Sequence, residues 1–256
     1  MKKRVVAVIP ARMASSRFPG KPLARLLDLP MVEHVRRRAA LADGIDEVVV
    51  ATCDDAIMDA VRAAGGLAIM TADTHERCTD RVHEASAGID ADVIAIVQGD
   101  EPLLIPEAVR QVTAPLLVDD GPRCVNLLSP LESDADFGNP NIVKAVCDLQ
   151  GRVMFLSRAP LPHFRKRVEC PVYRQTGIMA FTRDLLNTYA QLPETPFEKA
   201  EAVDMLRLLE HGIPILGVVV DYVTVGVDRP EDVPTVEDLL RTDPTQRKLY
   251  ERTRGV

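Results

Sequence analysis

The sequence predicts an α/β fold with a mainly parallel central sheet, helices on its faces and an antiparallel excursion. Residues 5–9 form a continuous apolar run rich in β-branched side chains, which is typical of a strand buried on both faces. Apolar runs then alternate with helical patterns through the first hundred residues, and such alternation indicates right-handed βαβ units. The hydrophobic content of 46% in 256 residues is ample for a core of this kind.

The first half of the chain is predicted to alternate regularly between strands and helices. After the strand at 5–9, further strands are expected at 47–51, 67–70 and 92–97, and helices at 31–42, 54–64 and 78–87. Gly65 and Gly66 end the second helix, because glycine readily adopts the left-handed conformation found at helix C-termini.

The second half is less regular. Strands are expected at 124–128, 142–147, 177–181 and 215–220, and helices at 183–191, at 200–211 and from Pro230 to about Arg241. The irregular stretch, about residues 120–180, is predicted to form the antiparallel excursion. Because no linker or repeat interrupts the chain, we predict one domain, 1–256.

Composition excludes several classes of partner. The net charge is -7 and tryptophan is absent, which argues against nucleic-acid binding and against attachment to an anionic membrane. No apolar run is long enough for a membrane span, and Pro10 and Arg12 interrupt the first one too early for a signal peptide. Five widely spaced cysteines without a CxxC pair predict reduced thiols in a cytoplasmic protein.

The loop after the first strand concentrates positive charge. It carries Arg12, Arg17 and Lys21, with the hydroxyls of Ser15 and Ser16 between them. Loops at the carboxyl ends of parallel strands hold ligands in open α/β sheets. Cations at this place in an acidic chain indicate a polyanionic ligand such as a nucleoside triphosphate, although a solvated basic loop would have the same composition. No Walker A pattern occurs.

Two further segments offer carboxylates. The run QGDEP, residues 98–102, follows the strand at 92–97, and its adjacent acids could ligate a hard cation; a capped turn is the alternative. Asp228 in VGVDRP follows another strand-like run, and from its position it could simply cap the next helix.

The order of residues 11–23, ARMASSRFPGKPL, resembles the nucleotidyltransferases that activate sugars. Within them it is most similar to the family that makes CMP-activated acidic sugars, typified by 3-deoxy-manno-octulosonate (Kdo) cytidylyltransferase, in which QGDEP occurs in the same form. The resemblance extends to about residue 240. It implies a single Rossmann-like nucleotidyltransferase domain that transfers CMP from CTP to an acidic acceptor and releases pyrophosphate.

The resemblance also implies roles for individual residues. Lys21, Arg17, Asp100 and Asp228 would be catalytic, and Asp100 and Asp228 would hold Mg²⁺. The nucleotide would contact Ala11, Arg12, Ser15, Ser16, Arg17, Lys21, Thr71, Arg77, Gln98 and Asp100. The anionic acceptor would contact Gln98, Arg158, Gln175, Met179 and Asp204, with Arg158 of FLSRAPLP as a two-point carboxylate clamp.

Several family elements are altered in this chain. In THERCTDR, residues 74–81, Arg77 and Cys78 replace the usual serine and glycine. Gln175 or Thr176 falls where a histidine is usual, Met179 replaces a tyrosine, and Met205 follows Asp204 where glutamine is usual. Arg229 replaces a threonine. The four changes other than that at Arg229 predict an acceptor preference shifted away from Kdo, unless compensating residues preserve it.

Three readings of function remain open from the sequence. The first is CMP transfer to Kdo or a related 3-deoxy sugar acid. The second is a cytidylyltransferase for a different small acid, such as phosphonoformate. The third is a noncatalytic nucleotide sensor on the same fold, which the acids and Lys21 disfavour; a metal-dependent hydrolase is weaker still. The resemblance further implies a homodimer formed through the irregular second half.

Overall fold

The computed structural model describes residues 2–15, 17–166, 168–223 and 225–254. Its main sheet has the strand order β11-β7-β10-β6-β1-β4-β5. The parallel part comprises β1 (Val5–Ala11), β4 (Glu47–Thr52), β5 (Leu67–Met70) and β6 (Val93–Val97). The chain runs from β1 outward to β4 and β5 and then returns to place β6 on the other side of β1. The strand order therefore reverses between β1 and β6, where open α/β sheets bind their ligands.

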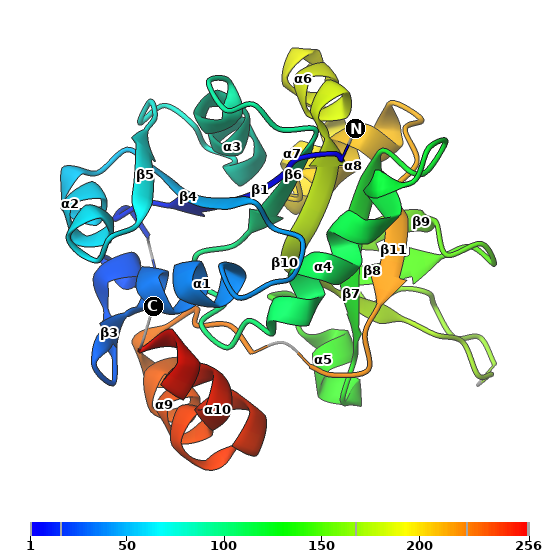
Figure 1. Ribbon diagram of the computed structural model, residues 1–256. Coiled ribbons are helices and arrows are strands. Elements are labelled where there is room, and N and C mark those ends of the chain that lie inside the picture. The colour runs from blue at the N-terminus through cyan, green and yellow to red at the C-terminus, as the bar shows by residue number, and fades with distance from the viewer. Residues whose placement is uncertain (1, 16, 167, 224, 255–256) are drawn as a thin grey trace.

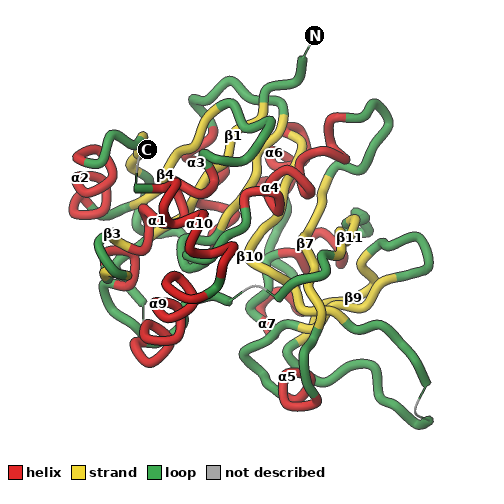
Figure 2. The backbone as a smooth tube through the Cα atoms, turned by 60° about the horizontal axis from the view of Figure 1, so that its bottom comes forward, coloured by secondary structure: helices red, strands yellow, loops and turns green. Residues whose placement is uncertain are grey.

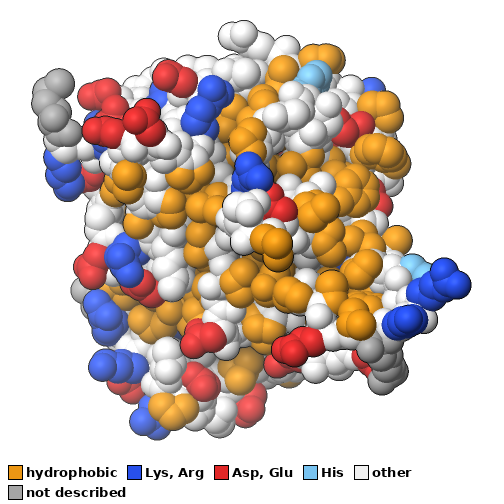
Figure 3. Space-filling model, turned by 90° about the vertical axis from the view of Figure 1, so that its right-hand side faces the viewer, with side chains coloured by type: hydrophobic (Ala, Val, Ile, Leu, Met, Phe, Trp, Pro, Cys, Tyr) orange, Lys and Arg blue, Asp and Glu red, His pale blue; other side chains and the backbone are white. Residues whose placement is uncertain are grey.

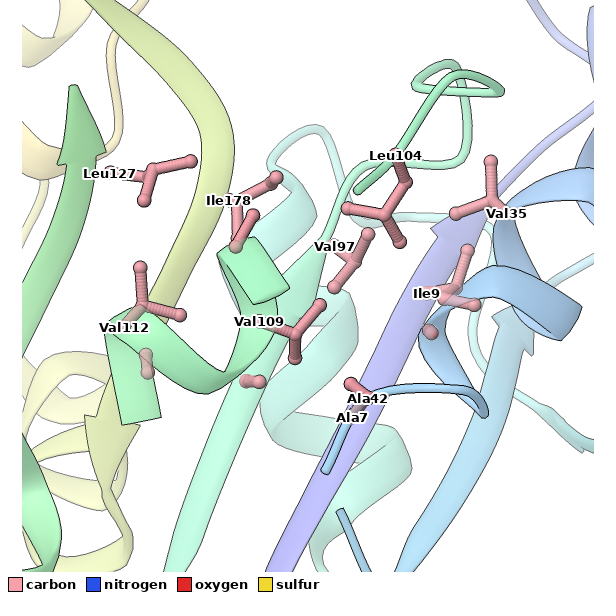
Figure 4. Packing of buried hydrophobic residues seen from close by; sticks show 14 of the residues in the cluster. Ala7, Ile9, Val35, Ala42, Val97, Leu104, Val109, Val112, Leu127 and Ile178 are labelled. Carbon is pink, nitrogen blue, oxygen red and sulfur yellow. The ribbon is translucent and has the colours of Figure 1, made fainter. Parts of the chain in front are cut away.

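Helices cover both faces of this sheet (Figure 1). One face packs against α1 (Met31–Ala39), α2 (Asp55–Ala63) and α4 (Pro106–Thr113). The other packs against α3 (Cys78–Ser86), α6 (Arg183–Gln191) and α8 (Met205–Glu210). Along β1, Ala7 and Ile9 belong to the first core and Val6 and Val8 to the second, as the alternation of a doubly buried strand requires. Figure 4 shows Ile9, Val97 and Val109 converging in the first core.

The second half supplies the antiparallel part. The long strand β10 (Tyr173–Thr182) runs antiparallel to β6, to β7 (Cys124–Pro130) and to β8 (Lys144–Cys147). β9 (Val153–Ser157) pairs with β8, and β11 (Leu216–Val219) lies parallel to β7. Figure 2 shows α5 (Asp134–Gly138) and the loop after β9 extending away from the body of the sheet.

The C-terminal helices α9 (Val233–Thr242) and α10 (Pro244–Thr253) cover the short hairpin of β2 (Arg25–Leu26) and β3 (Leu29–Pro30). A third apolar cluster, which includes Leu26, Leu103 and Val227, lies beneath them. Leu103 follows the QGDEP segment and Val227 precedes Asp228, so this cluster anchors both acid-bearing loops. Among the described residues, no helix is long and apolar enough to cross a membrane.

The predicted fold class is confirmed, and some elements differ. The single helix predicted at 200–211 is wrong: α7 (Pro196–Glu201) ends at Ala202, whose φ of 52° is left-handed, and α8 starts at Met205. The strand predicted at 177–181 begins earlier, at Tyr173, because its pairing with β8 and the far end of β7 extends it. Helices α4 and α10 and strand β9 are additions to the prediction.

Candidate active site

A pocket opens at the carboxyl ends of β1 and β6, where the strand order reverses. Its volume is about 320 Å³. We call it the nucleotide-side pocket. Its lining contains Pro10, Ala11, Arg12, Ala14, Ser15, Arg17, Lys21, Pro22, His75, Glu76, Arg77, Cys78, Arg81, Gln98, Gly99 and Asp100. Five arginine and lysine side chains against two carboxylates in this lining make it a site for a polyanion.

The loop after β1 is held in shape by its own backbone. Gly20 has a φ of 76° and its N–H donates to the Met13 carbonyl at 3.0 Å. The Phe18 N–H donates to Ser15 Oγ at 3.2 Å. The turn at Gly20 needs the left-handed conformation that glycine adopts without a side-chain clash. It delivers Lys21 to the pocket at the start of a short 3-10 turn.

Two ion pairs join this loop to the predicted metal-binding acids. Lys21 Nζ lies 2.6 Å from Asp100 Oδ2 and donates to the Val227 carbonyl at 2.9 Å. Arg17 lies 3.0 Å from Asp228. The Val227 N–H also donates to the Asp100 carbonyl at 2.9 Å, which ties the two acid-bearing loops together. The four residues predicted to be catalytic thus lie in one cluster, although Asp100 and Asp228 are far apart in the chain.

The remaining predicted nucleotide residues are placed unevenly. Arg12 reaches the His75 carbonyl at 3.4 Å, and Arg77 lines the pocket with its Nε buried and without a partner among the described residues. Thr71 lies behind the pocket, where its hydroxyl accepts a hydrogen bond from Arg81. Ser16 lies outside the described residues.

A second pocket of about 300 Å³ adjoins the first, and we call it the acceptor-side pocket. The two share Arg17, Cys78, Gln98 and Asp100. With Gln98 among the shared residues, the remaining lining holds the other four residues predicted for the acceptor and several neighbours: Glu101, Asn141, Val143, Arg158, Arg174, Gln175, Thr176, Gly177, Met179, Ala202, Val203, Asp204, Met205, Gly226, Val227 and Asp228. A nucleotide in one pocket and an acid in the other would meet at Asp100.

Gln98 stands at the junction of the two pockets. Its N–H donates to the Gly177 carbonyl at 3.0 Å, and its Nε2 donates to Cys78 Sγ at 2.9 Å. A Cβ at Gly177 would lie only 2.5 Å from Gln98 Cγ. Glycine at this position therefore lets the Gln98 side chain occupy the junction.

Asp204 is bound to the start of α3. Its Oδ2 accepts hydrogen bonds from the Thr79 hydroxyl at 2.9 Å, from the Thr79 N–H at 3.3 Å and from Cys78 Sγ at 3.2 Å. Burial, together with the Asp204 carboxylate, raises the pKa of the Cys78 thiol well above its usual value. The thiol therefore stays protonated and links Asp204 to Gln98. The left-handed turn at Ala202, which breaks the predicted helix, lies two residues before Asp204.

The guanidinium of Arg158 donates hydrogen bonds to backbone carbonyls. Nε donates to the Glu201 carbonyl at 2.8 Å and Nη1 to the Pro140 carbonyl at 3.2 Å. Lys144 is fully buried and donates to the carbonyls of Asn139, Ile142 and Arg158. Together these two cations fix the loops at one end of the acceptor-side pocket. The predicted acceptor residue Gln175 is similarly engaged, since its Nε2 donates to Asn126 Oδ1 at 2.7 Å.

Glu101 differs from its neighbour Asp100 in its surroundings and in the pKa of its carboxyl group. Burial, with the adjacent Asp100 charge, raises the pKa of Glu101 to about 7. It lines both the acceptor-side pocket and a third cavity behind it. Lys144 and Arg174 are not among the residues predicted from the sequence. The signal for Lys144 was a cation within the apolar run IVKAVC, and for Arg174 it was the position immediately before QTGIM.

The carboxylate set fits a hard cation only in part. Among the described residues, no group of three or more His, Cys, Asp or Glu side chains is arranged to hold a metal ion. Asp100 and Asp228 each hold a cationic side chain, Lys21 and Arg17, where a metal ion would also find oxygen ligands. Two protein carboxylates with further oxygens from substrate phosphates are the usual arrangement for Mg²⁺.

Comparison with known proteins agrees with this geometry. Residues 6–215 match the family model described as cytidylyltransferase. The 3-deoxy-manno-octulosonate cytidylyltransferase of Geobacter metallireducens is 43% identical over 250 residues, covering 93% of this chain and 98% of that relative. The one from Syntrophotalea carbinolica is 44% identical over 246 residues, covering 93% and 98%.

Solved structures give the same answer. CMP:2-keto-3-deoxy-manno-octonic acid synthetase complexed with CTP superposes with a TM-score of 0.89 at 38% identity, covering 94% of this chain and 99% of that one. A cytidylyltransferase from Leptospira borgpetersenii, at 16% identity and a TM-score of 0.65, shares the fold. The chain is a nucleotidyltransferase and belongs to the cytidylyltransferase family.

Proposed function

We propose that this enzyme transfers CMP from CTP to 3-deoxy-manno-octulosonate and releases pyrophosphate. The observation that carries the proposal is the pair of adjoining pockets, one cationic and one lined by the predicted acceptor residues, which meet at Asp100 and Gln98. Relatives above 40% identity that cover almost all of the chain bear the name of this activity.

The reaction is a displacement at the α-phosphorus of CTP. The acceptor hydroxyl oxygen forms a bond to phosphorus, the bond from phosphorus to the β-phosphate oxygen breaks, and the hydroxyl proton is lost to solvent. Arg12, Arg17 and Lys21 would bind the triphosphate and disperse the charge that develops on it. Gln98, at the junction of the pockets, would orient the acceptor beside the α-phosphate. No protein nucleophile is needed.

Asp100 and Asp228 would hold Mg²⁺, as expected from the sequence. A bound magnesium ion supplies neutralisation of the phosphate charge and a template for attack. In the free protein Lys21 and Arg17 pair with the two acids. These side chains are long enough to exchange the carboxylates for phosphate oxygens. Turnover should therefore stop with a chelator and return with added magnesium.

Pyrophosphate release with a panel of acceptors tests the proposal. The panel holds Kdo, its amino analogue, sialic-acid-like sugars and phosphonoformate, each with CTP. Kdo-dependent release with a CMP-Kdo product, identified by mass, is the expected result. Preference for another acid would replace the acceptor, and the absence of turnover with every acid would favour a sensor. The four altered family elements make this panel necessary.

We also propose a homodimer formed through the irregular second half. Figure 3 shows hydrophobic side chains gathered on the side of the molecule that carries β9 and β11. Leu149, Met154 and Val219 are large apolar side chains exposed in these segments. Because an exposed apolar face is typical of an interaction site, Met154→Asp should give a monomer in sedimentation experiments. Leu67→Asp, on the far edge strand β5, should leave the dimer intact.

We place the reaction in the cytoplasm, where CTP is available. The five cysteines are free thiols in the structure, as they would be in a reducing compartment. Fractionation of cells that express the protein, with CTP-dependent activity as the readout, tests this location.

A further inference from the structure

Three cations lie at one end of the acceptor-side pocket: Arg158 and Arg174 line it, and Lys144 is fully buried behind its lining. Arg174 on β10 pairs directly with Lys144 on β8 in the antiparallel ladder. Side chains that are directly opposite in such a ladder lie on the same face of the sheet, where like charges repel each other. Lys144 also contacts the Arg158 carbonyl. An arrangement of this kind is favourable when an anion is bound beside it.

Two of the three cations are already engaged. Lys144 donates to three backbone carbonyls. Arg158 uses Nε on Glu201 and Nη1 on Pro140. A guanidinium holds a carboxylate at two points through either the Nε–Nη2 edge or the Nη1–Nη2 edge. Each edge of Arg158 contains an atom that is already used, so Arg158 offers a carboxylate one point of contact through Nη2.

Arg174 is different. It lines the acceptor-side pocket, and in the described part of the chain no group accepts a hydrogen bond from its guanidinium and no carboxylate lies within ion-pair distance. Its neighbour in β7 is Ser129, whose hydroxyl also has no partner among the described residues, and its neighbour in β8 is a cation. Its charge opposes the rise in the pKa of Glu101 that burial causes. Arg174 therefore lies near the acids while both of its edges remain available.

We propose that Arg174 makes the two-point contact with the acceptor carboxylate and thereby selects acids as acceptors. This inference rests on the proposed function. In a 2-keto-3-deoxy sugar acid the carboxyl group is bonded to the carbon that carries the attacking hydroxyl in the ring form. A two-point grip on that carboxylate therefore also orients the hydroxyl toward the α-phosphate. Arg158 and Lys144 keep the surrounding loops in place.

The test measures kcat and KM for Kdo and for CTP by pyrophosphate release. Arg174→Gln should raise the KM for Kdo by about 10- to 100-fold, the cost of losing hydrogen bonds to a charged group. The KM for CTP and the melting temperature should stay close to wild type. The KM of Arg174→Lys for Kdo should lie between those of wild type and Arg174→Gln, because lysine keeps the charge and loses the planar two-point contact. Arg247→Gln, an exposed arginine beside Glu251 on α10, is the matched control and should change nothing.

An acceptor whose carboxylate is replaced by an amide separates contact from support. The wild-type enzyme should lose with the amide about the factor that Arg174→Gln loses with the acid, and the variant should lose nothing more. A Kdo KM within threefold of wild type in Arg174→Gln, or a full amide penalty in that variant, overturns the inference. If Arg174→Gln does not fold, Arg174→Lys serves the same comparison.

The outcome also separates this inference from the proposed function. If wild-type enzyme uses a different carboxylic acid, the proposed acceptor fails, and the acid and amide comparison is made with that compound. Equal penalties there still support Arg174. If none of the acids supports pyrophosphate release by the wild-type enzyme, both the proposed function and the role of Arg174 are overturned.

Discussion

The nucleotide-side and acceptor-side pockets share a border and are built in opposite ways. The nucleotide side comes from short continuous segments that follow β1 and β6 and begin α3. Two of its cations, Lys21 and Arg17, pair with Asp100 and Asp228, and phosphate oxygens would replace these carboxylates when substrate binds. The acceptor side is assembled from β10, from the turn between α7 and α8 and from distant loops. Many of its polar groups are bound to the protein itself. Most of the cations on the nucleotide side come from one continuous loop, whereas on the acceptor side Arg174 is the cation without a partner among the described residues.

The largest loss is expected on the nucleotide side, from Asp100→Asn. The change removes one anionic oxygen and almost no volume, so turnover should fall by about 100-fold or more while the fold is retained. Magnesium-dependent kinetics and thermal melting check both parts. Asp119→Asn, whose side chain is 99% exposed, is the control. Asp228→Asn should behave like Asp100→Asn, and wild-type turnover in both variants would remove the metal assignment.

Lys21→Ala tests whether the nucleotide side binds the outer phosphates of CTP through Lys21. Lys21 reaches Asp100 and Val227 from the end of the loop, and loss of one charge-assisted contact weakens binding by about 10- to 100-fold. Calorimetry should show this loss for CTP with magnesium and little change for CMP. Equal losses for the two nucleotides would place Lys21 elsewhere on the ligand.

Arg158→Lys tests whether the acceptor side depends on support. Lysine keeps the charge, and it cannot join the carbonyls of Glu201 and Pro140 as the guanidinium does. We expect a Kdo KM raised by about 10-fold together with a melting temperature lower by a few degrees, as about 1 kcal/mol of lost stability would give. Arg247→Lys is the control. A large change in the KM for CTP alone would assign Arg158 to the nucleotide side.

The smallest effect is expected at Asp204. Asp204→Asn keeps an oxygen that can accept hydrogen bonds from Thr79 and Cys78. Its turnover should therefore stay within about threefold of wild type, and its free energy of unfolding should stay close to that of wild type. Asp204→Ala should lower the free energy of unfolding by about 1–2 kcal/mol. Chemical denaturation and kinetics with varied Kdo measure the two quantities. A strong kinetic defect in Asp204→Asn with unchanged stability would show that Asp204 contacts the sugar.

What the sequence could predict follows the same division. The positions of strand β1 and of the QGDEP segment can be predicted from neighbouring residues alone, because a buried strand followed by charged residues places those charges at a sheet edge. The charged loop and Asp100 could therefore be placed at one sheet edge in advance, whereas the place of Asp228 beside them was implied by the resemblance to known nucleotidyltransferases. The position of Asp204 depends on the left-handed turn at Ala202, and helical periodicity continues across that turn without marking it.

The fold shows a similar limit at β10. The sequence indicated only its apolar end at 177–181. Its polar end, Tyr173 to Gln175, is a strand because β7 and β8 pair with it, and such pairing depends on residues that are distant in the chain. Arg174 lies in that polar end. A residue placed by long-range pairing gives no local sign of the pocket it enters.

The pairing of Lys21 with Asp100 and of Arg17 with Asp228 has a thermodynamic consequence. A triphosphate that arrives alone would draw the two cations from the acids and leave two carboxylates without a partner. A divalent ion that arrives alone would displace the cations and leave them unsatisfied. Only the two together exchange every partner, so we expect each to raise the affinity for the other by the same factor, since such coupling is reciprocal. Such coupling would disfavour unproductive occupancy of the resting site by free nucleotide or free metal.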